Sequence, residues 1–326
     1  FAHLMIPFPG YYDNVPGVTV EPNVEPANES HVSAAWQVWA YTSAAPDFLG
    51  NKATVLDPDS KVLRGGTNGW TCMSANPQGK KAWADPKAGW ASAREAAPVC
   101  FDAAGFDWMK GWMARKKPLM KRDAFVWMLQ GDLGFDNTDP FVTSKGEADP
   151  DQWIESGPHL MMFPKDPAAL SDAFTSDFSL GEPYTMFPGT DFAHLMIPFP
   201  GYYDNVPGVT VEPNVEPANE SHVSAAWQVW AYTSAAPDFL GNKATVLDPD
   251  SKVLRGLGLL WRGDDALAGG AARPAHVAAL HLHPRRPRAA PCLGRASGRA
   301  RRQQGWNAAR VRHGRCRVRG SSEVHS

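Results

Sequence analysis

Two histidines each begin an apolar run, His159-Leu160-Met161 and His194-Leu195-Met196. If these runs are strands that pair in register, both imidazoles lie on one face of a sheet. Together with a carboxylate such as Glu155 they could bind a transition metal, or they could act as an acid and a base. The simpler alternative is a histidine at each strand end, bonded to a backbone carbonyl. His159, His194 and Glu155 are therefore the catalytic candidates, although a third ligand at a diagnostic spacing is missing.

A second group of candidates consists of tryptophans in predicted loops. Exposed aromatic rings stack on sugars and other flat ligands, but a loop that folds back on itself buries the same residues. Tryptophans at helical spacing, such as Trp36 and Trp108, are predicted to be core instead. The candidate ligand-binding residues are Trp70, Trp83, Trp90 and Trp153.

The segment from Asp132 to Asp151 is rich in acidic residues, with Lys145 as its one basic residue. Oxygen-rich loops can hold Ca²⁺, but the spacing of an EF-hand is not present. We favour a solvated loop that uses Asp and Asn in its turns. The sequence therefore predicts no cofactor, with calcium or a transition metal as the alternative. It also contains no nucleophile elbow, phosphate-binding glycine loop or dinucleotide fingerprint.

Cys72 and Cys100 are separated by a stretch rich in proline and glycine. No Cys-x-x-Cys and no neighbouring histidine support a redox pair or half of a metal site. We therefore predict a structural disulfide that closes an irregular loop, which is worth about 3–4 kcal/mol in the chain-entropy model. Such a bond indicates an oxidising compartment. Cys292 and Cys316 have no predicted role.

Periodicity and turn residues predict the elements that position these candidates. We expect one helix over 31–44, ended by Pro46, and a second helix after Asp102, which is a suitable N-cap. A turn at Asp57-Pro58-Asp59-Ser60 predicts a hairpin over 52–64. This order of elements predicts an α+β fold with an antiparallel sheet and two main helices. Buried strands are expected at Phe125–Leu129, His159–Phe163, Tyr184–Phe187 and His194–Phe199.

Residues 1–65 recur without a substitution as residues 192–256. The repeat divides the chain into an orphan strand with a linker over 1–27, a single intact domain over 28–205, and a truncated second copy over 206–256. The second copy lacks partners for its apolar face. We therefore expect it to be poorly packed, or to pair with residues 1–10 by swapping.

The C-terminal segment, residues 257–326, differs in composition from the rest of the chain. It holds 14 arginines and three acidic residues, a net charge of +11, whereas residues 1–256 carry −13. With little apolar surface to bury, such a tail is expected to be disordered. It is either a basic arm that neutralises phosphates or the translation of rearranged DNA. We favour the second, and we expect no specific nucleic-acid partner.

Several motifs resemble those of a family of uncharacterised, exported bacterial proteins, over roughly residues 31–198. They are Val62–Met73, Pro98–Asp102, Met128–Asp132, Asp136–Pro140, Trp153–His159 and Met186–Thr190, the last followed by Ala193–Met196. The resemblance implies a periplasmic or extracellular protein whose signal peptide lies outside this sequence. Members of the family carry a single unit behind a signal sequence, whereas this chain has a repeat and an arginine-rich tail. The family has no known function, so the resemblance implies none.

These observations predict an exported bacterial module that binds a small molecule or a glycan at its loop tryptophans. The alternative is a metal-dependent or acid/base hydrolase-like enzyme that uses the two histidines. No apolar run reaches the ~18 residues that a membrane span needs. The sequence does not indicate an oligomeric state.

Overall fold

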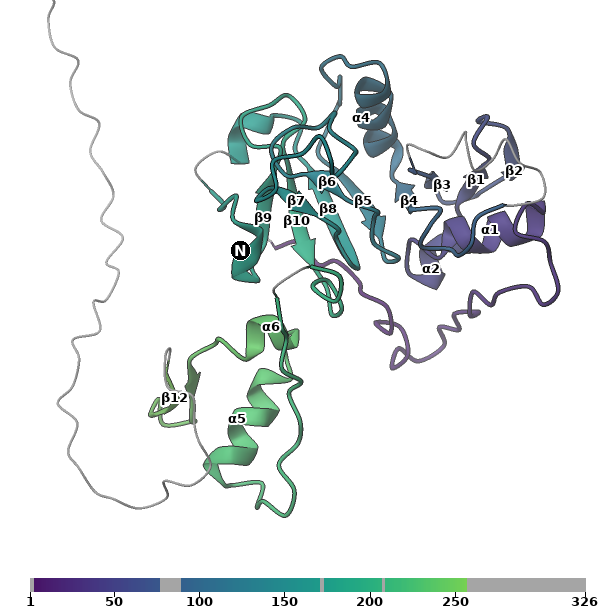
Figure 1. The fold of residues 1–326 in the computed structure, drawn as a ribbon. Helices are drawn as coiled ribbons and strands as arrows, with labels where there is room; N and C mark the ends of the chain where they lie inside the picture. Colours follow the sequence, from purple (N-terminus) through teal and green to yellow (C-terminus); the bar gives the residue numbers. More distant parts are fainter. Residues whose placement is uncertain (1–2, 77–88, 171–172, 207–208, 257–326) are drawn as a thin grey trace, which may run out of the picture. The chain divides into compact units, whose positions relative to one another are not determined.

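The computed structural model describes residues 3–76, 89–170, 173–206 and 209–256 (Figure 1). The predictions for the tail at 257–326 and for Trp83 lie outside these residues. In the described part of the chain, no helix is long and apolar enough to cross a membrane.

The fold is mixed α/β, built on a large and mostly antiparallel sheet, as the sequence predicted. Its eight strands lie in the order β2-β1-β3-β4-β5-β8-β10-β9, and β1 and β3 form the parallel pair. The strands are β1 (Thr54–Leu56), β2 (Val62–Arg64), β3 (Thr71–Ser74), β4 (Pro98–Phe101), β5 (Ala124–Met128), β8 (His159–Phe163), β9 (Tyr184–Met186) and β10 (His194–Pro198). Two short ribbons, β6 (Phe135–Asp136) with β7 (Trp153–Ile154) and β11 (Val246–Leu247) with β12 (Val253–Arg255), are separate from this sheet.

The described helices are few and short, and side-chain caps begin both α1 (Ala34–Thr42) and α4 (Ala103–Met113). Ser33 accepts a hydrogen bond from the Trp36 amide at the start of α1, and Asp102 does the same for the Gly105 amide at the start of α4. Both caps satisfy an N–H group that the helix itself leaves unpaired. The other helices are α2 (Asp47–Gly50), η1 (Pro167–Leu170), η2 (Phe178–Leu180), α5 (Ala225–Thr233) and α6 (Asp238–Gly241).

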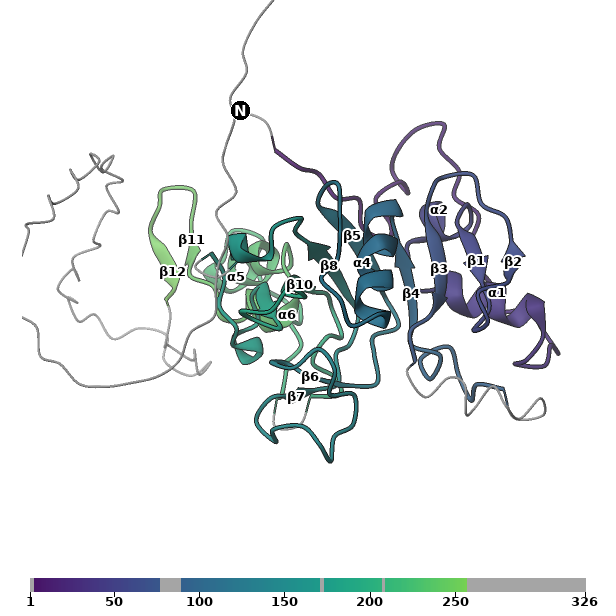
Figure 2. The ribbon, with the colours of Figure 1, turned by 90° about the horizontal axis from the view of Figure 1, so that it is seen from above.

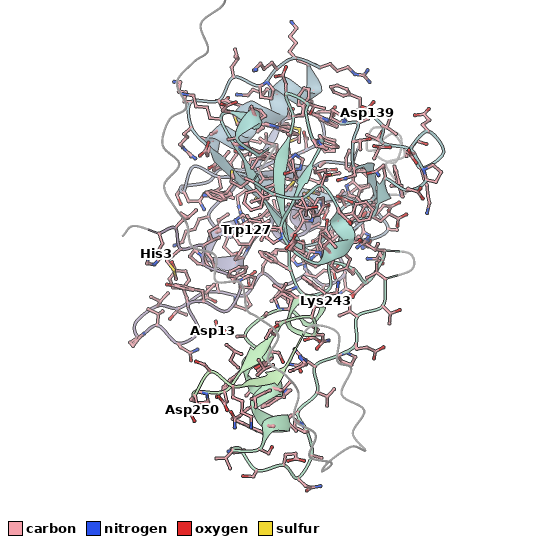
Figure 3. All side chains as sticks on the ribbon, turned by 90° about the vertical axis from the view of Figure 1, so that its left-hand side faces the viewer. His3, Asp13, Trp127, Asp139, Lys243 and Asp250 are labelled. Carbon is pink, nitrogen blue, oxygen red and sulfur yellow. A yellow bond between two sulfur atoms is a disulfide. The ribbon has the colours of Figure 1, made fainter. Side chains whose placement is uncertain are left out.

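The sheet separates two apolar layers, because side chains alternate between its faces along each strand. On β5, Val126 and Met128 pack in the layer of α4, whereas Trp127 packs in the layer of α1. Figure 2 shows α4 beside β4 and β5, and α1 near β1 and β3. Trp127, labelled in Figure 3, is 3% exposed. We call the two sides the α4 face and the α1 face.

The predicted disulfide between Cys72 and Cys100 is confirmed, but its setting differs from the one expected. The two cysteines lie directly opposite each other on the antiparallel strands β3 and β4, on the α1 face, and are fully buried. The two strands that carry the cysteines and bound the stretch between them were not predicted. The bond therefore joins neighbouring strands in the middle of the sheet.

The two copies of the repeat adopt the same local structure, but their surroundings differ. Helix α5 repeats α1 with the same cap, and the β11–β12 hairpin repeats the register of β1–β2. Tyr41 is fully buried, whereas its counterpart Tyr232 is 44% exposed. The reverse holds at the other end of the repeat, where β10 is buried but the identical residues 3–7 are irregular and mostly exposed. The boundaries predicted for the intact domain, 28–205, remain a prediction.

Removing the disulfide by the paired substitution Cys72→Ala and Cys100→Ala should lower the free energy of unfolding by about 3–4 kcal/mol, because the unfolded chain regains the entropy of an open loop. Urea unfolding of the oxidised wild type and of the variant measures the difference. Wild type kept reduced during unfolding and refolding should match the variant. An unchanged midpoint would contradict a stabilising role for the bond.

Candidate functional site

A cavity of about 580 Å³ lies on the α4 face, between α4, the central strands and the loop that follows β5. The apolar stripe of α4 forms one wall, and the strands supply the other. Five methionines line the cavity, and their unbranched side chains adapt to irregular shapes. They are Met109, Met128, Met161, Met186 and Met196. The aromatic residues of the lining are Phe101, Trp108, Trp112, Phe135, Trp153, Phe163 and Phe187.

Both candidate histidines line this cavity, and the chain holds them in the same way. His159 is the first residue of β8 and His194 the first residue of β10, and they are 0% and 2% exposed. The Nδ1 atom of His159 lies 2.7 Å from the Gly157 carbonyl oxygen, and that of His194 lies 3.0 Å from the Phe192 carbonyl oxygen. A carbonyl only accepts, so each Nδ1 carries the proton and donates it to the residue two positions earlier.

Burial lowers the pKa of His159 and of His194 to about 4, although the carbonyl contacts act in the opposite direction. Both imidazoles are therefore neutral at pH 7. With Nδ1 protonated, each Nε2 carries a lone pair. Neither Nε2 has a hydrogen-bond partner among the described residues. Two neutral imidazoles that line the cavity thus each keep a buried acceptor that no described residue uses.

The two histidines lie on one face of the sheet, but they are not opposite each other. β8 and β10 are antiparallel neighbours in which His159 is paired with Pro198. His194 is four residues away along β10, about 13 Å between Cα atoms at the rise of a strand. The two acceptors therefore suit two points of a ligand better than one shared atom.

The third catalytic candidate, Glu155, lies apart from the histidines. Its carboxylate accepts from the Trp153 Nε1 at 3.3 Å and is 3.8 Å from the Lys145 Nζ, and it is not part of the cavity lining. Within the described part of the chain, no cluster of three or more His, Cys, Asp or Glu side chains could hold a metal ion.

Besides Glu95, the cavity is lined by the carboxyl group of Asp132, which is not among the site residues predicted from the sequence. It is 3% exposed, and its Oδ1 accepts from the Gly134 and Ser156 amides, both at 3.0 Å. Burial raises its pKa to about 7, against the effect of these hydrogen bonds. Its position after Gly131, at the end of a buried strand, could have marked it as a site residue. From the sequence it was instead counted as part of the acidic loop.

The other acidic residues of that loop mostly bind backbone. Asp136 accepts from the amides of Thr138 and Asp139 through Oδ1 and from the Asp149 amide through Oδ2. Such carboxylates stabilise turns by satisfying N–H groups that have no strand or helix partner. The loop is therefore ordered around Asp136, and this order holds β6 and β7 over the cavity.

A hydrogen-bonded chain lies behind His159. The Tyr184 and Tyr202 hydroxyls are 2.6 Å apart, and the Tyr202 hydroxyl donates to the Ser156 Oγ at 3.1 Å. The Gly157 amide donates to the Tyr202 carbonyl oxygen at 3.0 Å. These contacts fix the backbone at Gly157, whose carbonyl oxygen in turn orients the imidazole.

The candidate tryptophans are spread over both faces of the sheet. Trp153 lines the cavity, where its indole lies against Gly134. A Cβ at Gly134 would clash with this ring, and the φ of 110° also requires glycine. Trp90 is 1% exposed on the α1 face, where its Nε1 donates to the Tyr41 hydroxyl, and Trp70 packs partly buried on the same face. Of the described candidates, Trp153 is the one at the cavity.

The free energy of unfolding should fall as the pH falls from about 6.5 to about 4. In this range the two histidines take up protons in the unfolded chain but stay neutral in the folded one, so the unfolded state binds more protons. Asp132 acts in the opposite direction, because its folded pKa of about 7 lies above its ordinary value. The net effect of these three groups is about one proton, or roughly 1.4 kcal/mol per pH unit. Urea unfolding at intervals of pH measures the slope.

His159→Asn is the matched control, since an asparagine amide can still donate to the Gly157 carbonyl oxygen but does not titrate. This variant should lower the dependence of the free energy of unfolding on pH by the equivalent of about one proton, whereas Asp132→Asn should make that dependence steeper. If both variants keep the wild-type slope, the burial of neutral imidazoles is not the cause of the pH dependence.

Comparison with known proteins gave no match, whether to a protein family, to a curated protein or to a solved structure. The resemblance of the motifs to exported bacterial proteins therefore stays a prediction. What the chain can do has to be inferred from the chemistry of the cavity.

Proposed function

We propose that this chain is a binding module for a small, largely apolar molecule with hydroxyl or other donor groups, held in the cavity on the α4 face. One observation carries the proposal: two fully buried imidazoles line an apolar cavity with acceptor atoms that no described residue uses. A buried polar atom without a partner costs free energy. A ligand that donates to it recovers that cost.

The size and the walls of the cavity support this ligand class. Small-molecule sites are mostly apolar pockets of roughly 300–1,000 Å³ with a few polar groups that fix orientation. Methionine and aromatic walls suit rings and alkyl groups better than a polar glycan. The Trp108 Nε1, also buried and without a described partner, offers one donor. We therefore favour a ring compound that carries hydroxyls at separate positions.

The disulfide supports placing this module outside the cytoplasm, because such bonds persist in oxidising compartments. We propose an exported binding protein on this ground together with the sequence motifs.

An acid/base enzyme is the second candidate. It is favoured by the Asp132 carboxyl, whose pKa of about 7 suits proton transfer, in the same cavity as two neutral imidazoles. Binding without turnover is the simpler proposal, because the two histidines are offset along the sheet. A ligand that is released chemically changed would favour the enzyme.

A thermal-shift screen of the full chain against apolar compounds with and without hydroxyl groups tests the proposal. Compounds with hydroxyls should raise the melting temperature, because they bind the folded state alone. The variant His194→Asn keeps a donor for the Phe192 carbonyl oxygen but lacks the Nε2 acceptor. It should weaken binding of the best compound by about two- to tenfold, the worth of one hydrogen bond.

Trp70→Phe, on the opposite face of the sheet, is the control and should leave the affinity unchanged. Equal affinity of wild type and His194→Asn for every compound found would contradict a role for the imidazole.

A further inference from the structure

The α1 face of the sheet contains a docking site that we call the α1 seat, formed by β3 with Trp90, Cys100 and Leu129. The Trp90 Nε1 donates to the Tyr41 hydroxyl at 3.0 Å, and the Leu129 amide donates to the Ala44 carbonyl oxygen at 3.0 Å. The Cys100 Sγ lies 3.6 Å from the Tyr41 carbonyl oxygen, and β1 pairs with β3. Residues 33–64 occupy this seat.

A second segment of the same sequence exists in the chain, because residues 224–255 repeat residues 33–64. The residues that form the seat lie between the two copies and occur once. There is therefore one seat for two identical occupants.

The second segment already has the shape that the seat accepts. The hydrogen bonds between it and the residues that precede it repeat those of the first copy: Trp36 Nε1 donates to Glu25 at 2.9 Å, and Trp227 Nε1 donates to Glu216 at 3.1 Å. The hydrogen bond from the Asn23 amide to the Asp47 carboxylate at 3.1 Å likewise recurs from the Asn214 amide to the Asp238 carboxylate at 3.2 Å. A preformed segment pays little ordering entropy when it docks.

What the second segment lacks is the seat. Trp36 is 1% exposed and Ala40 fully buried, whereas the corresponding side chains of α5 are partly exposed. Within the described residues, β11 pairs with β12 alone. Its other edge, which corresponds to the edge of β1 that pairs with β3, is therefore open. Because α5 and β11 have the same sequence as α1 and β1, their apolar face and open edge fit the α1 seat in the same way.

We propose that residues 224–255 are a second occupant of the α1 seat and exchange there with residues 33–64 of the same molecule. Residues 199–206 pack in the core, where Tyr202 is fully buried, and Asn214 is already bonded to the second segment. The free stretch is therefore 207–213, which spans at most about 25 Å when extended, or about five strand spacings. A tethered segment competes at a high effective concentration, which favours the same molecule over a neighbour.

The first segment keeps the advantage in the wild type. Its connection leads directly into β3, whereas the second segment has to be carried across several strands by an extended stretch. Extending that stretch costs conformational entropy, which favours the first occupant. The seat is on the face of the sheet opposite the cavity, so this inference does not rest on the proposed function.

Cysteine trapping in the full chain tests the exchange. In the first segment Thr54 pairs with Thr71 of β3, and the equivalent residue of the second segment is Thr245. Thr71→Cys with Thr245→Cys, without further substitutions, should form a bond in a minor fraction of molecules at equilibrium. Adding Trp36→Ala, which damages the first occupant, should make this bond the major species. Thr71→Cys with Thr54→Cys is the control, and peptide mapping reads the bonds.

Melting temperatures give a second measurement that does not require cross-linking. Trp227→Ala alone should have little effect, and Trp36→Ala should lower the melting temperature less than the two substitutions together, by about 5 °C or more. Tyr41→Phe and Tyr232→Phe repeat the comparison with milder changes if the alanine variants do not fold.

Three outcomes overturn the proposal. The first is that, in the Trp36→Ala background, the bond between positions 71 and 245 is absent while the control bond forms. The second is that this bond joins two molecules, seen as a covalent dimer. The third is that Trp36→Ala alone destabilises the chain as much as the double variant does.

Discussion

The pairing of β3 with β4 is the contact on which the rest of the structure depends. In the strand order it joins the three-stranded part, β2-β1-β3, to the five strands that carry the cavity. Cys72 and Cys100 lie opposite each other at this junction, so the hydrogen-bonded ladder is reinforced by a covalent bond. Helix α1 packs over the same two strands and shields the sulfurs from water. The apolar layers on both faces of the sheet are therefore built on this cross-linked pair of strands.

The cavity follows from the way in which the other face is covered. A short helix, α4, and an irregular loop cannot fill the space above five strands as a long helix would, and the methionine side chains border what remains. The histidines add two polar atoms to this apolar surface at a cost in burial, because their Nε2 atoms have lost water. Groups whose pKa is strongly shifted by burial, beside a cavity, are candidates for a functional site. This is why the cavity, rather than the tryptophans of the α1 face, carries the proposed function.

Part of this arrangement could be predicted from the sequence. The apolar runs at Phe125, His159, Tyr184 and His194 correspond to strands β5, β8, β9 and β10, because each run is bounded by Gly or Pro and is long enough for a strand. β3 and β4 were missed, since a stretch rich in proline and glycine hides their short apolar pattern. The cavity was not predictable, because its residues come from segments far apart in the chain. Asp132 and Trp153 meet the histidines there only after the sheet has formed.

The repeat separates what the sequence determines from what the tertiary structure decides. Identical residues form the same capped helix and the same hairpin at 34–64 and at 225–255, although their surroundings differ. The hydrogen bonds of a helix and of a hairpin close between residues near in sequence, so they need no outside partner. Residues 194–198, in contrast, are a buried strand between β8 and β9, whereas the identical residues 3–7 are irregular. A central strand obtains its hydrogen bonds and its burial from other segments, so only the tertiary structure can decide that it is a strand.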